Sequence, residues 1–265
     1  MQGFTLITGA TGGLGGAFAR LLAKQGESLI LTGRSEEKLR SLCAELKESF
    51  PETKIRYAPC DLTDENSRKK LIEQVKNFCE VEKEPLFRLV NVAGADIQKP
   101  LLEYTEEKIL FQCRVNFEGA VSLCRGAIGL GVKEIINISS VSGIYPMPYF
   151  AIYSATKGAL TSFSLALREE MRGAGVRVTA ILPGAIPTRE DVKEQIKGQG
   201  LWGKIAVKQP SYVAEKSLKA VAKNKGKVVV GFANKLMNVG TKLIPLPLKL
   251  KFIAKRWSKI RKDAF

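Results

Sequence analysis

Short apolar runs of β-forming residues alternate with longer runs of helical periodicity along most of this chain, and that alternation limits its fold more than any other feature. The strand-like runs are Phe4–Thr8, Ser28–Thr32, Lys54–Ala58, Phe87–Val92, Lys133–Ile138, Val176–Leu182 and Lys227–Gly231. The segments between them place apolar residues at helical spacing. Strands that alternate with helices predict an α/β fold, in which a doubly wound parallel sheet of about seven strands has helices on both faces.

The composition fits one large domain followed by a basic tail. The chain has 265 residues, of which 45% are hydrophobic, so it can bury a substantial core. Its net charge is +16, and residues 233–265 contribute nine Lys or Arg against Asp263 alone. We therefore expect one domain over residues 1–232 and a basic amphipathic C-terminal extension over residues 233–265.

Missing residue types and segments restrict both the chemistry and the location. The chain has no histidine, which excludes Ser-His-Asp and Cys-His catalysis and any histidine-ligated metal. Its five cysteines form no C-x-x-C pair and no metal-ligand spacing, so we expect reduced thiols and no metal site. The sequence shows no secretory signal and no run of about 18 uncharged apolar residues. These features predict a cytoplasmic protein.

A glycine-rich segment follows the first strand-like run and opens the first helix-like run. Its sequence is Thr8-Gly-Ala-Thr-Gly-Gly-Leu-Gly15. Glycine lets the backbone turn tightly and approach a pyrophosphate, whose negative charge is favoured at a helix N-terminus. A plain turn is the alternative, but the position between strand and helix favours a Rossmann-type dinucleotide site. The residues expected to bind the cofactor here are Gly9, Thr11, Gly13, Leu14 and Gly15.

The end of the second strand-like run predicts which nicotinamide cofactor binds. A carboxylate there would hold the ribose hydroxyls of NAD and repel a 2′-phosphate. The segment Leu31-Thr-Gly-Arg-Ser35 has no carboxylate before Glu36, and Arg34 can pair with a phosphate in a bidentate manner. A solvated loop charge is the alternative for Arg34. We predict NADP(H) rather than NAD(H).

A Tyr-x-x-x-Lys pair, Tyr153 and Lys157, follows the fifth strand-like run. The pattern occurs twice more in the chain, but only this pair follows strand-borne serines, Ser139 and Ser140. Lowering the phenol pKa from about 10 by two to three units takes about 3–4 kcal/mol. An ammonium group one helical turn away can supply that amount. We predict that Tyr153 is the general acid or base, whereas plain packing and solvation of the pair is the alternative.

The order of the motifs resembles that of the classical short-chain dehydrogenase/reductase family over roughly residues 3–230. The motifs are the glycine turn, Asp61-Leu62, Asn91-Val-Ala-Gly94, Asn116, Ser140, Tyr153-x-x-x-Lys157, and Pro183-Gly184 with Thr188. Each motif alone is weak, but together they are highly specific. One departure is Val92, where the family commonly has a second asparagine.

The resemblance implies roles for further residues. Lys157 would bind the nicotinamide ribose, and Asn116 would support a water that leads protons from Lys157 to solvent. Ser140 would hold the carbonyl oxygen beside the phenol, because strand alternation turns Ser139 to the opposite face. The other cofactor-binding residues implied are Asp61 and Leu62 beside the adenine, Asn91, Ala93 and Gly94 in the crevice, and Pro183, Gly184, Ile186 and Thr188 near the nicotinamide amide and the phosphates.

Two segments are expected to shape the substrate side. Val141–Phe150 is apolar and partly aromatic, so it should form one wall of a pocket. The residues between Thr188 and Pro210 are charged and contain glycines, which suits a mobile lid and equally a plain surface loop. Neither segment offers an obvious cationic clamp, so we expect the carbonyl to sit in a largely apolar molecule.

The C-terminal extension shows helical spacing in two stretches. Apolar residues recur at Leu236, Val239 and Leu243 until Pro245 and Pro247 interrupt, and then at Leu250, Ile253, Trp257 and Ile260 on one face of a basic stretch. A basic amphipathic helix with a tryptophan is typical of a membrane-surface anchor. Packing against the chain's own core or a second subunit, or disorder, are the alternatives.

The residues favour an enzyme. The leading hypothesis is an NADP(H)-dependent oxidoreductase that interconverts a ketone and a secondary alcohol on an apolar, lipid-like substrate such as a 3-oxoacyl chain or a steroid-like ketone. An alcohol dehydrogenase working mainly in the oxidative direction and a non-catalytic NADP(H)-binding protein are the alternatives. The apolar stripe of the tail argues against a nucleic-acid partner. The resemblance implies a dimer or tetramer, and the tail implies a peripheral position on the cytoplasmic membrane face.

Overall fold

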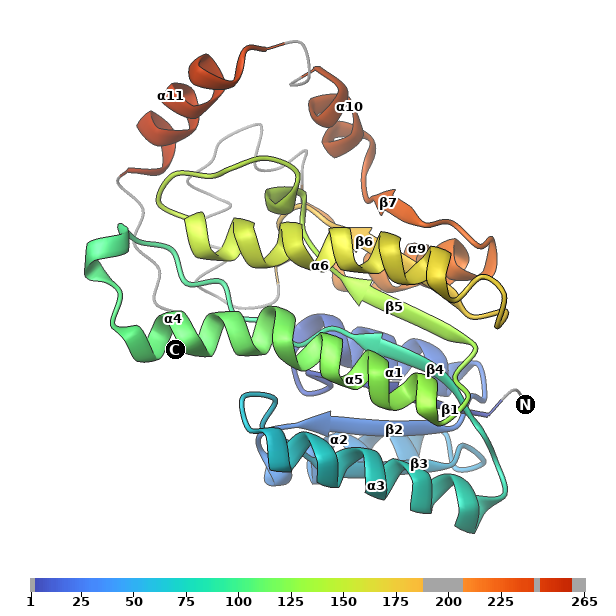
Figure 1. Ribbon diagram of the computed structural model, residues 1–265. Helices are drawn as coiled ribbons and strands as arrows, with labels where there is room; N and C mark the ends of the chain where they lie inside the picture. The colour runs from blue at the N-terminus through green and yellow to red at the C-terminus, as the bar shows by residue number, and fades with distance from the viewer. Residues whose placement is uncertain (1–2, 188–206, 241–243, 259–265) are drawn as a thin grey trace.

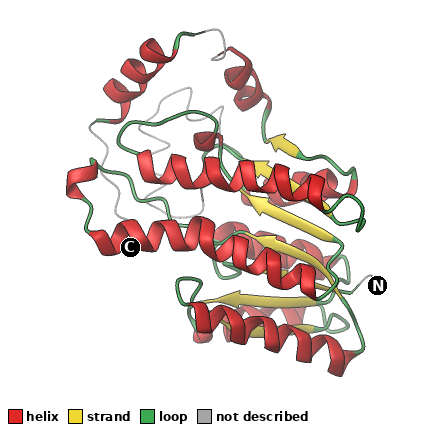
Figure 2. Cartoon of the chain, viewed as in Figure 1, coloured by secondary structure: helices red, strands yellow, loops and turns green. Residues whose placement is uncertain are grey.

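The computed structural model describes residues 3–187, 207–240 and 244–258 (Figures 1 and 2). Seven parallel strands form one sheet in the order β3-β2-β1-β4-β5-β6-β7. They are β1 (Phe4–Ile7), β2 (Leu29–Gly33), β3 (Ile55–Pro59), β4 (Leu86–Asn91), β5 (Glu134–Ile138), β6 (Arg177–Leu182) and β7 (Lys227–Val229). All seven predicted strands and the doubly wound Rossmann-type sheet are therefore confirmed, with strand ends within two residues of the prediction.

Helices cover both faces of the sheet, as the alternation predicts (Figure 2). The longer ones are α1 (Gly13–Lys24), α2 (Glu36–Ser49), α3 (Glu65–Glu82), α4 (Glu106–Cys113), α5 (Gly119–Gly129), α6 (Ala151–Glu170), α9 (Pro210–Ala222), α10 (Phe232–Gly240) and α11 (Leu246–Trp257). Three short helical turns are η1 (Leu101–Glu103), the π-helix η2 (Arg114–Glu118) and η3 (Val141–Gly143).

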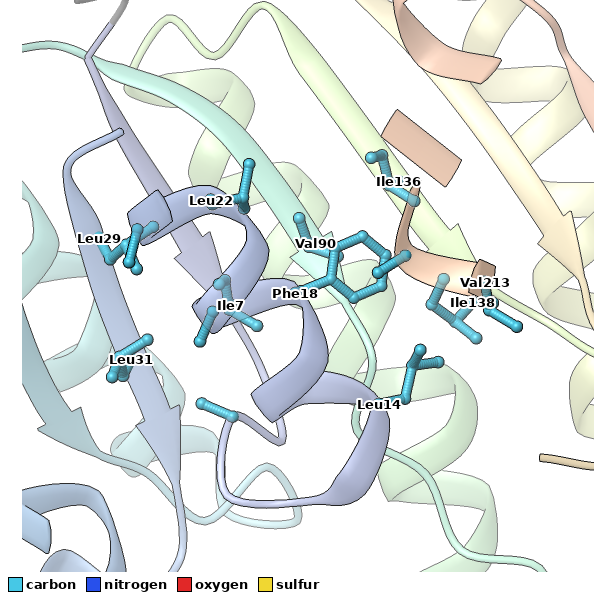
Figure 3. Close-up of a cluster of buried hydrophobic side chains, with 14 of the residues drawn as sticks. Ile7, Leu14, Phe18, Leu22, Leu29, Leu31, Val90, Ile136, Ile138 and Val213 are labelled. Carbon is cyan, nitrogen blue, oxygen red and sulfur yellow. The ribbon is translucent and has the colours of Figure 1, made fainter. Parts of the chain in front are cut away.

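Two apolar clusters hold these layers together. On one face, α1, α2 and α9 pack on the sheet, and Figure 3 shows Phe18 of α1 between Val90 of β4 and Val213 of α9. On the other face, α3, α5 and α6 form a second cluster against the same strands. Phe18 is fully buried, so α1 is fixed in position at the end of β1. Burial of a phenylalanine of this kind stabilises the fold by roughly 1.5–3 kcal/mol.

The C-terminal extension forms two helices that extend beyond β7 above α6 (Figure 1). Pro245 precedes α11, as the sequence predicts, but Pro247 lies within its first turn and does not interrupt it. A proline is tolerated there because the first backbone N–H groups of a helix have no intrahelical acceptor. None of the described helices is long and apolar enough to cross a membrane.

Candidate active site

The strand order reverses between β1 and β4, and ligands of open α/β sheets bind at the carboxyl ends of the strands at such a point. The side chain of Thr8 ties these two ends together. Its hydroxyl accepts hydrogen bonds from the backbone N–H of Val92 at 2.9 Å and of Ala93 at 3.1 Å. The predicted Gly9 and Gly94 motifs are thereby held beside each other at the reversal.

The glycine turn after β1 has the shape that a pyrophosphate requires. Gly9 has φ of 60°, a left-handed conformation that glycine adopts without strain. A Cβ on Gly15 would lie 2.1 Å from the carbonyl oxygen of Gly9, so only glycine lets α1 approach the turn this closely. No side chain caps the N-terminus of α1 at Gly12, so its backbone N–H groups suit an anion. The residues fit a dinucleotide.

The other predicted residues of this turn differ in what they expose. Thr11 and Gly13 are exposed, whereas the side chain of Leu14 is buried in the apolar cluster under α1 (Figure 3). A contribution of Leu14 to cofactor binding would therefore come from its backbone.

Arg34 directly follows β2 and is exposed, with Ser35 capping α2 behind it. Its guanidinium lies 5.5 Å from the centre of the Phe111 ring. No carboxylate contacts this guanidinium among the described residues, so its charge suits the 2′-phosphate of the predicted cofactor.

The predicted adenine side, Asp61 and Leu62, follows β3. Asp61 is exposed, and its Oδ1 accepts hydrogen bonds from the backbone N–H and the hydroxyl of Thr63 at 2.9 and 2.8 Å. Leu62 is buried against α5. A Cβ built on Gly119 of α5 would lie 3.1 Å from the Cβ of Leu62. The Thr63 contacts fix the orientation of the exposed Asp61 carboxylate.

Asn91 at the end of β4 points into the protein. Its Nδ2 donates to Asn137 Oδ1 at 2.9 Å, and Asn137 Nδ2 donates to Ser164 Oγ of α6 at 2.9 Å. This buried chain links β4, β5 and α6, so the predicted role of Asn91 in the crevice falls to its backbone. Ala93 and Gly94 continue from it along the reversal point.

The segment after β6 carries the last predicted cofactor residues. The carbonyl oxygen of Pro183 accepts a hydrogen bond from the backbone N–H of Val141 at 3.0 Å, which joins this segment to the loop after β5. A Cβ on Gly184 would lie 2.6 Å from Asn234 Nδ2 of α10. Ile186 packs against the cluster under α1, and Thr188 lies outside the described residues, as does most of the predicted lid.

Lys157 is buried at the centre of the site. Its Nζ donates to the carbonyl oxygen of Ile138 at 2.9 Å. A Cβ on Gly94 would lie 3.2 Å from this Nζ and 3.1 Å from Asn116 Oδ1, so three predicted residues from separate motifs meet at one point. The side chain of Lys157 is only 4% exposed.

Burial changes the acidity of this lysine. Loss of solvation lowers the pKa of Lys157 from its ordinary 10.5 to about 8, although the nearby charge of Asp96 raises it in part. An ammonium with a pKa near 8 is roughly nine-tenths protonated at pH 7. The group is therefore still a cation at neutral pH and loses its charge under mildly alkaline conditions.

Asn116 lies in the π-helix between α4 and α5, and a π-helical turn often marks a functional site. Its Oδ1 accepts from the Ala95 backbone N–H at 2.7 Å, and its Nδ2 donates to the Ala95 carbonyl at 2.9 Å and to Thr156 Oγ1 at 3.1 Å. The side-chain amide is thus bonded at both ends within the protein. It fixes the chain after Gly94 against α6.

The two serines after β5 face different partners. Ser139 Oγ donates to the carbonyl oxygen of Lys157 at 2.7 Å and lies 2.7 Å from Thr161 Oγ1, so this hydroxyl holds α6 on the sheet. Ser140 Oγ accepts from the backbone N–H of Ser142 at 3.1 Å. That bond leaves its hydroxyl hydrogen available for another acceptor, as the predicted role requires.

Tyr153 is half-buried on the first turn of α6. The Nζ of Lys157 lies 5.8 Å from the centre of its ring. The ring also stacks on Phe150 with 4.3 Å between ring centres and 13° between ring planes. The Tyr153 ring therefore has both a buried cation and an aromatic side chain as neighbours.

Several contacts that shape this site were not predicted from the sequence. Gly143 and Gly158 touch, since a Cβ on Gly143 would lie 2.6 Å from the Gly158 backbone nitrogen, and this contact docks the serine loop on α6. Trp257 of α11 stacks over Phe150, with 6.5 Å between ring centres. The glycines at positions 143 and 158 were the sequence signal that could have indicated the backbone contact. The aromatic residues at positions 150 and 257 were the signal that could have indicated the ring stacking.

The fold and the glycine turn fit a dinucleotide-binding α/β protein, and the comparisons specify its family. The family model for short chain dehydrogenases matches residues 4–197. The chain belongs to the short-chain dehydrogenase/reductase family. Among the described residues no group of Cys, Asp and Glu has a geometry that could hold a metal.

Similar proteins act on diverse substrates. Serine 3-dehydrogenase of Agrobacterium fabrum is 34% identical over 193 residues, which are 71% of this chain and 74% of that one. The very-long-chain 3-oxoacyl-CoA reductase of Bos taurus is 32% identical over 200 residues, which are 70% of this chain and 60% of that one. The structure of L-sorbose reductase from Gluconobacter frateurii, complexed with NADPH and L-sorbose, superposes with a TM-score of 0.75 at 26% identity, covering 86% and 95% of the two chains.

Proposed function

We propose that this protein is an NADP(H)-dependent reductase that converts a ketone in an apolar molecule into a secondary alcohol. The observation that carries the proposal is the convergence of Gly94, Asn116 and the buried Lys157 beside Tyr153 at the point where the strand order reverses. NADPH, when bound, supplies the hydride. The exposed Arg34 after β2 favours the phosphorylated cofactor over NADH.

The proton comes from the hydroxyl of Tyr153. The Nζ of Lys157 lies 5.8 Å from the centre of the Tyr153 ring, and a cation beside a phenol favours its charged phenolate form. Lys157 is fixed at this distance by its bond to Ile138. The hydroxyl of Ser140 donates a hydrogen bond to the substrate carbonyl oxygen and holds it beside the phenol.

Asn116 serves as a positioning residue. Because its side-chain amide is bonded to Ala95 and Thr156, a water that passes protons from Lys157 to solvent would bind the backbone carbonyl of Asn116. The proposed proton path from Lys157 to solvent would then run past the backbone of the π-helix and not past the Asn116 side chain.

The substrate side supports an apolar molecule such as a 3-oxoacyl chain or a steroid-like ketone. Met147 and Phe150 are buried with Ile253, and Tyr145 and Trp257 pack on them. Apolar and aromatic walls of this kind are typical of sites that bind apolar ligands. The relative that reduces very-long-chain 3-oxoacyl-CoA is consistent with the same substrate class.

The experiment is a screen of NADPH oxidation with 3-oxoacyl, steroid and aromatic ketones, with a Tyr153→Phe variant alongside. We expect turnover with at least one apolar ketone, and a loss of turnover in Tyr153→Phe with NADPH affinity nearly unchanged. Normal turnover in the variant would reject the mechanism. If only alcohol oxidation were found, the alcohol dehydrogenase working in the oxidative direction would replace the reductase. The dimer or tetramer expected from the family stays a prediction that analytical ultracentrifugation tests.

A further inference from the structure

Exposed large apolar side chains gather on the C-terminal helices. Of the thirteen such residues in the described part of the chain, seven lie between residues 232 and 252. They are Phe232, Leu236 and Val239 on α10, Ile244 before α11, and Leu246, Leu248 and Phe252 on α11. Phe232 is 80% exposed and Phe252 is 71% exposed. A concentration of this kind marks an interaction surface, because single exposed apolar residues are ordinarily scattered.

The spacing places these side chains on definite faces. Phe232, Leu236 and Val239 recur at intervals of four and three residues, which aligns them along one side of α10. Leu248 and Phe252 lie four residues apart on α11. Both helices lie at the same end of the molecule (Figure 1). We call this set of seven residues the C-terminal docking surface.

The surroundings of the docking surface are strongly basic. From Lys216 to Lys262 the sequence contains fourteen Lys or Arg and no Asp or Glu. A cavity of about 310 Å³ between α9, β7 and α10 is lined by five lysines at positions 216, 219, 223, 225 and 235, with Phe232 among its lining residues. Glu215 pairs with Lys219, and no carboxylate contacts the other four among the described residues. Phe232 therefore belongs both to the lining of this lysine cavity and to the C-terminal docking surface.

We propose that the C-terminal docking surface binds the face of an anionic lipid bilayer, with its apolar side chains inserted and the lysine cavity against the lipid phosphates. A surface with apolar residues beside lysines suits a bilayer interface. Apolar side chains can insert among the acyl chains, and lysines are attracted to anionic headgroups. A second copy of the same surface would bring lysines against lysines. A nucleic acid would match the lysines and leave the exposed Phe232 and Phe252 in water.

This surface continues into the proposed active site. The neighbouring face of α11 places Ile253 against Met147 and Phe150, and the Nζ of Lys249 lies 5.5 Å from the ring centre of Tyr145. Phe150 in turn stacks on Tyr153. A membrane-bound α11 would therefore hold the apolar wall beside Tyr153 at the bilayer, where lipid-like ketones dissolve. That consequence rests on the proposed function, whereas membrane binding itself does not.

The test is co-sedimentation of the full chain with vesicles of phosphatidylcholine, alone or mixed with phosphatidylglycerol. We expect at least tenfold stronger binding to the anionic vesicles, and weaker binding as salt is raised. The Leu236→Ser/Phe252→Ser variant and the Lys223→Glu/Lys235→Glu variant should each lose at least tenfold. The matched controls are Val81→Ser on α3, which is 68% exposed, and Lys47→Glu/Lys70→Glu on α2 and α3, and both should bind as the wild type does.

Thermal unfolding and light scattering of each variant complete the experiment. Equal binding to neutral and anionic vesicles, or full binding by Leu236→Ser/Phe252→Ser, would overturn the proposal. An oligomer that this variant converts to monomer would assign the surface to a second copy of the chain. The assay involves no turnover, so an inactive protein that binds vesicles would refute only the proposed reductase, and an active one that does not bind would refute only the docking.

Discussion

The buried ammonium group of Lys157 should destabilise the folded protein, although the proposed reaction requires it. The fall of its pKa from 10.5 to about 8 corresponds to roughly 3 kcal/mol of unfavourable free energy for the protonated form. A Lys157→Met substitution removes that cost and keeps most of the volume. It also loses the hydrogen bond to the Ile138 carbonyl, which is worth about 1–1.5 kcal/mol. The variant should therefore be about 2 kcal/mol more stable than the wild type at pH 7 and catalytically inactive.

The pH dependence has a definite sign. Because the folded pKa is lowered, the wild type carries the full cost below pH 8, and the cost disappears as pH rises through about 10.5. The stability of the wild type relative to Lys157→Met should rise by about 3 kcal/mol over that range. Titrating groups that do not interact with Lys157 cancel in this difference.

Urea unfolding of both proteins without cofactor, at several pH values from 7 to 10, measures the effect. Lys47→Met, at an exposed lysine of α2, is the matched control and should show a difference that does not vary with pH. A pH-independent difference for Lys157→Met would refute the reasoning, because it would mean that this lysine is solvated in the folded protein.

Two further substitutions test the cofactor end. Arg34→Ala should raise the KM for NADPH by roughly 10- to 100-fold, the value of one or two charged hydrogen bonds, with the KM for NADH nearly unchanged; steady-state kinetics with both cofactors measures it, and equal effects on the two would contradict the assignment. Gly15→Ala should weaken NADPH binding at least tenfold and destabilise the fold by about 2 kcal/mol, because its Cβ would lie 2.1 Å from the Gly9 carbonyl. Gly129→Ala is the control, since nothing lies within 4 Å of its Cβ, and NADPH titration with urea unfolding should find it bound normally and slightly stabilised.

Local patterns in the sequence predicted the sheet well, because each strand is a short run of β-forming residues bounded by helical periodicity. The glycine turn and its place after β1 followed from the same signals, and so did the helical spacing in the tail. The unexpected tolerance of Pro247 shows the limit of such patterns. Whether a proline interrupts a helix depends on its distance from the N-terminus, and α11 begins at Leu246, one residue before Pro247.

Contacts between distant segments could not be predicted from spacing. No local sequence pattern marks the π-helix that carries Asn116. The side-chain amide of Asn116 is bonded there to Ala95 and Thr156, which lie far from it in the sequence. The inward orientation of Asn91 depends on Asn137, its partner in register on β5. Packing of Ile253 on Phe150 joins residues about a hundred positions apart. Each of these features depends on contacts between residues that are distant in the sequence, and local patterns do not specify such contacts.

The close approach of Gly143 and Gly158 has a consequence for redesign of substrate range. With no side chain between them, the backbone of the serine-bearing loop lies directly against the backbone of α6. Residues farther out on the same loop, such as Tyr145 and Met147, belong to the apolar wall and take no part in that contact. Libraries that randomise those outer positions, with both glycines held constant, should alter which of the proposed ketone substrates are accepted while the proposed proton donor, Tyr153, keeps its alignment.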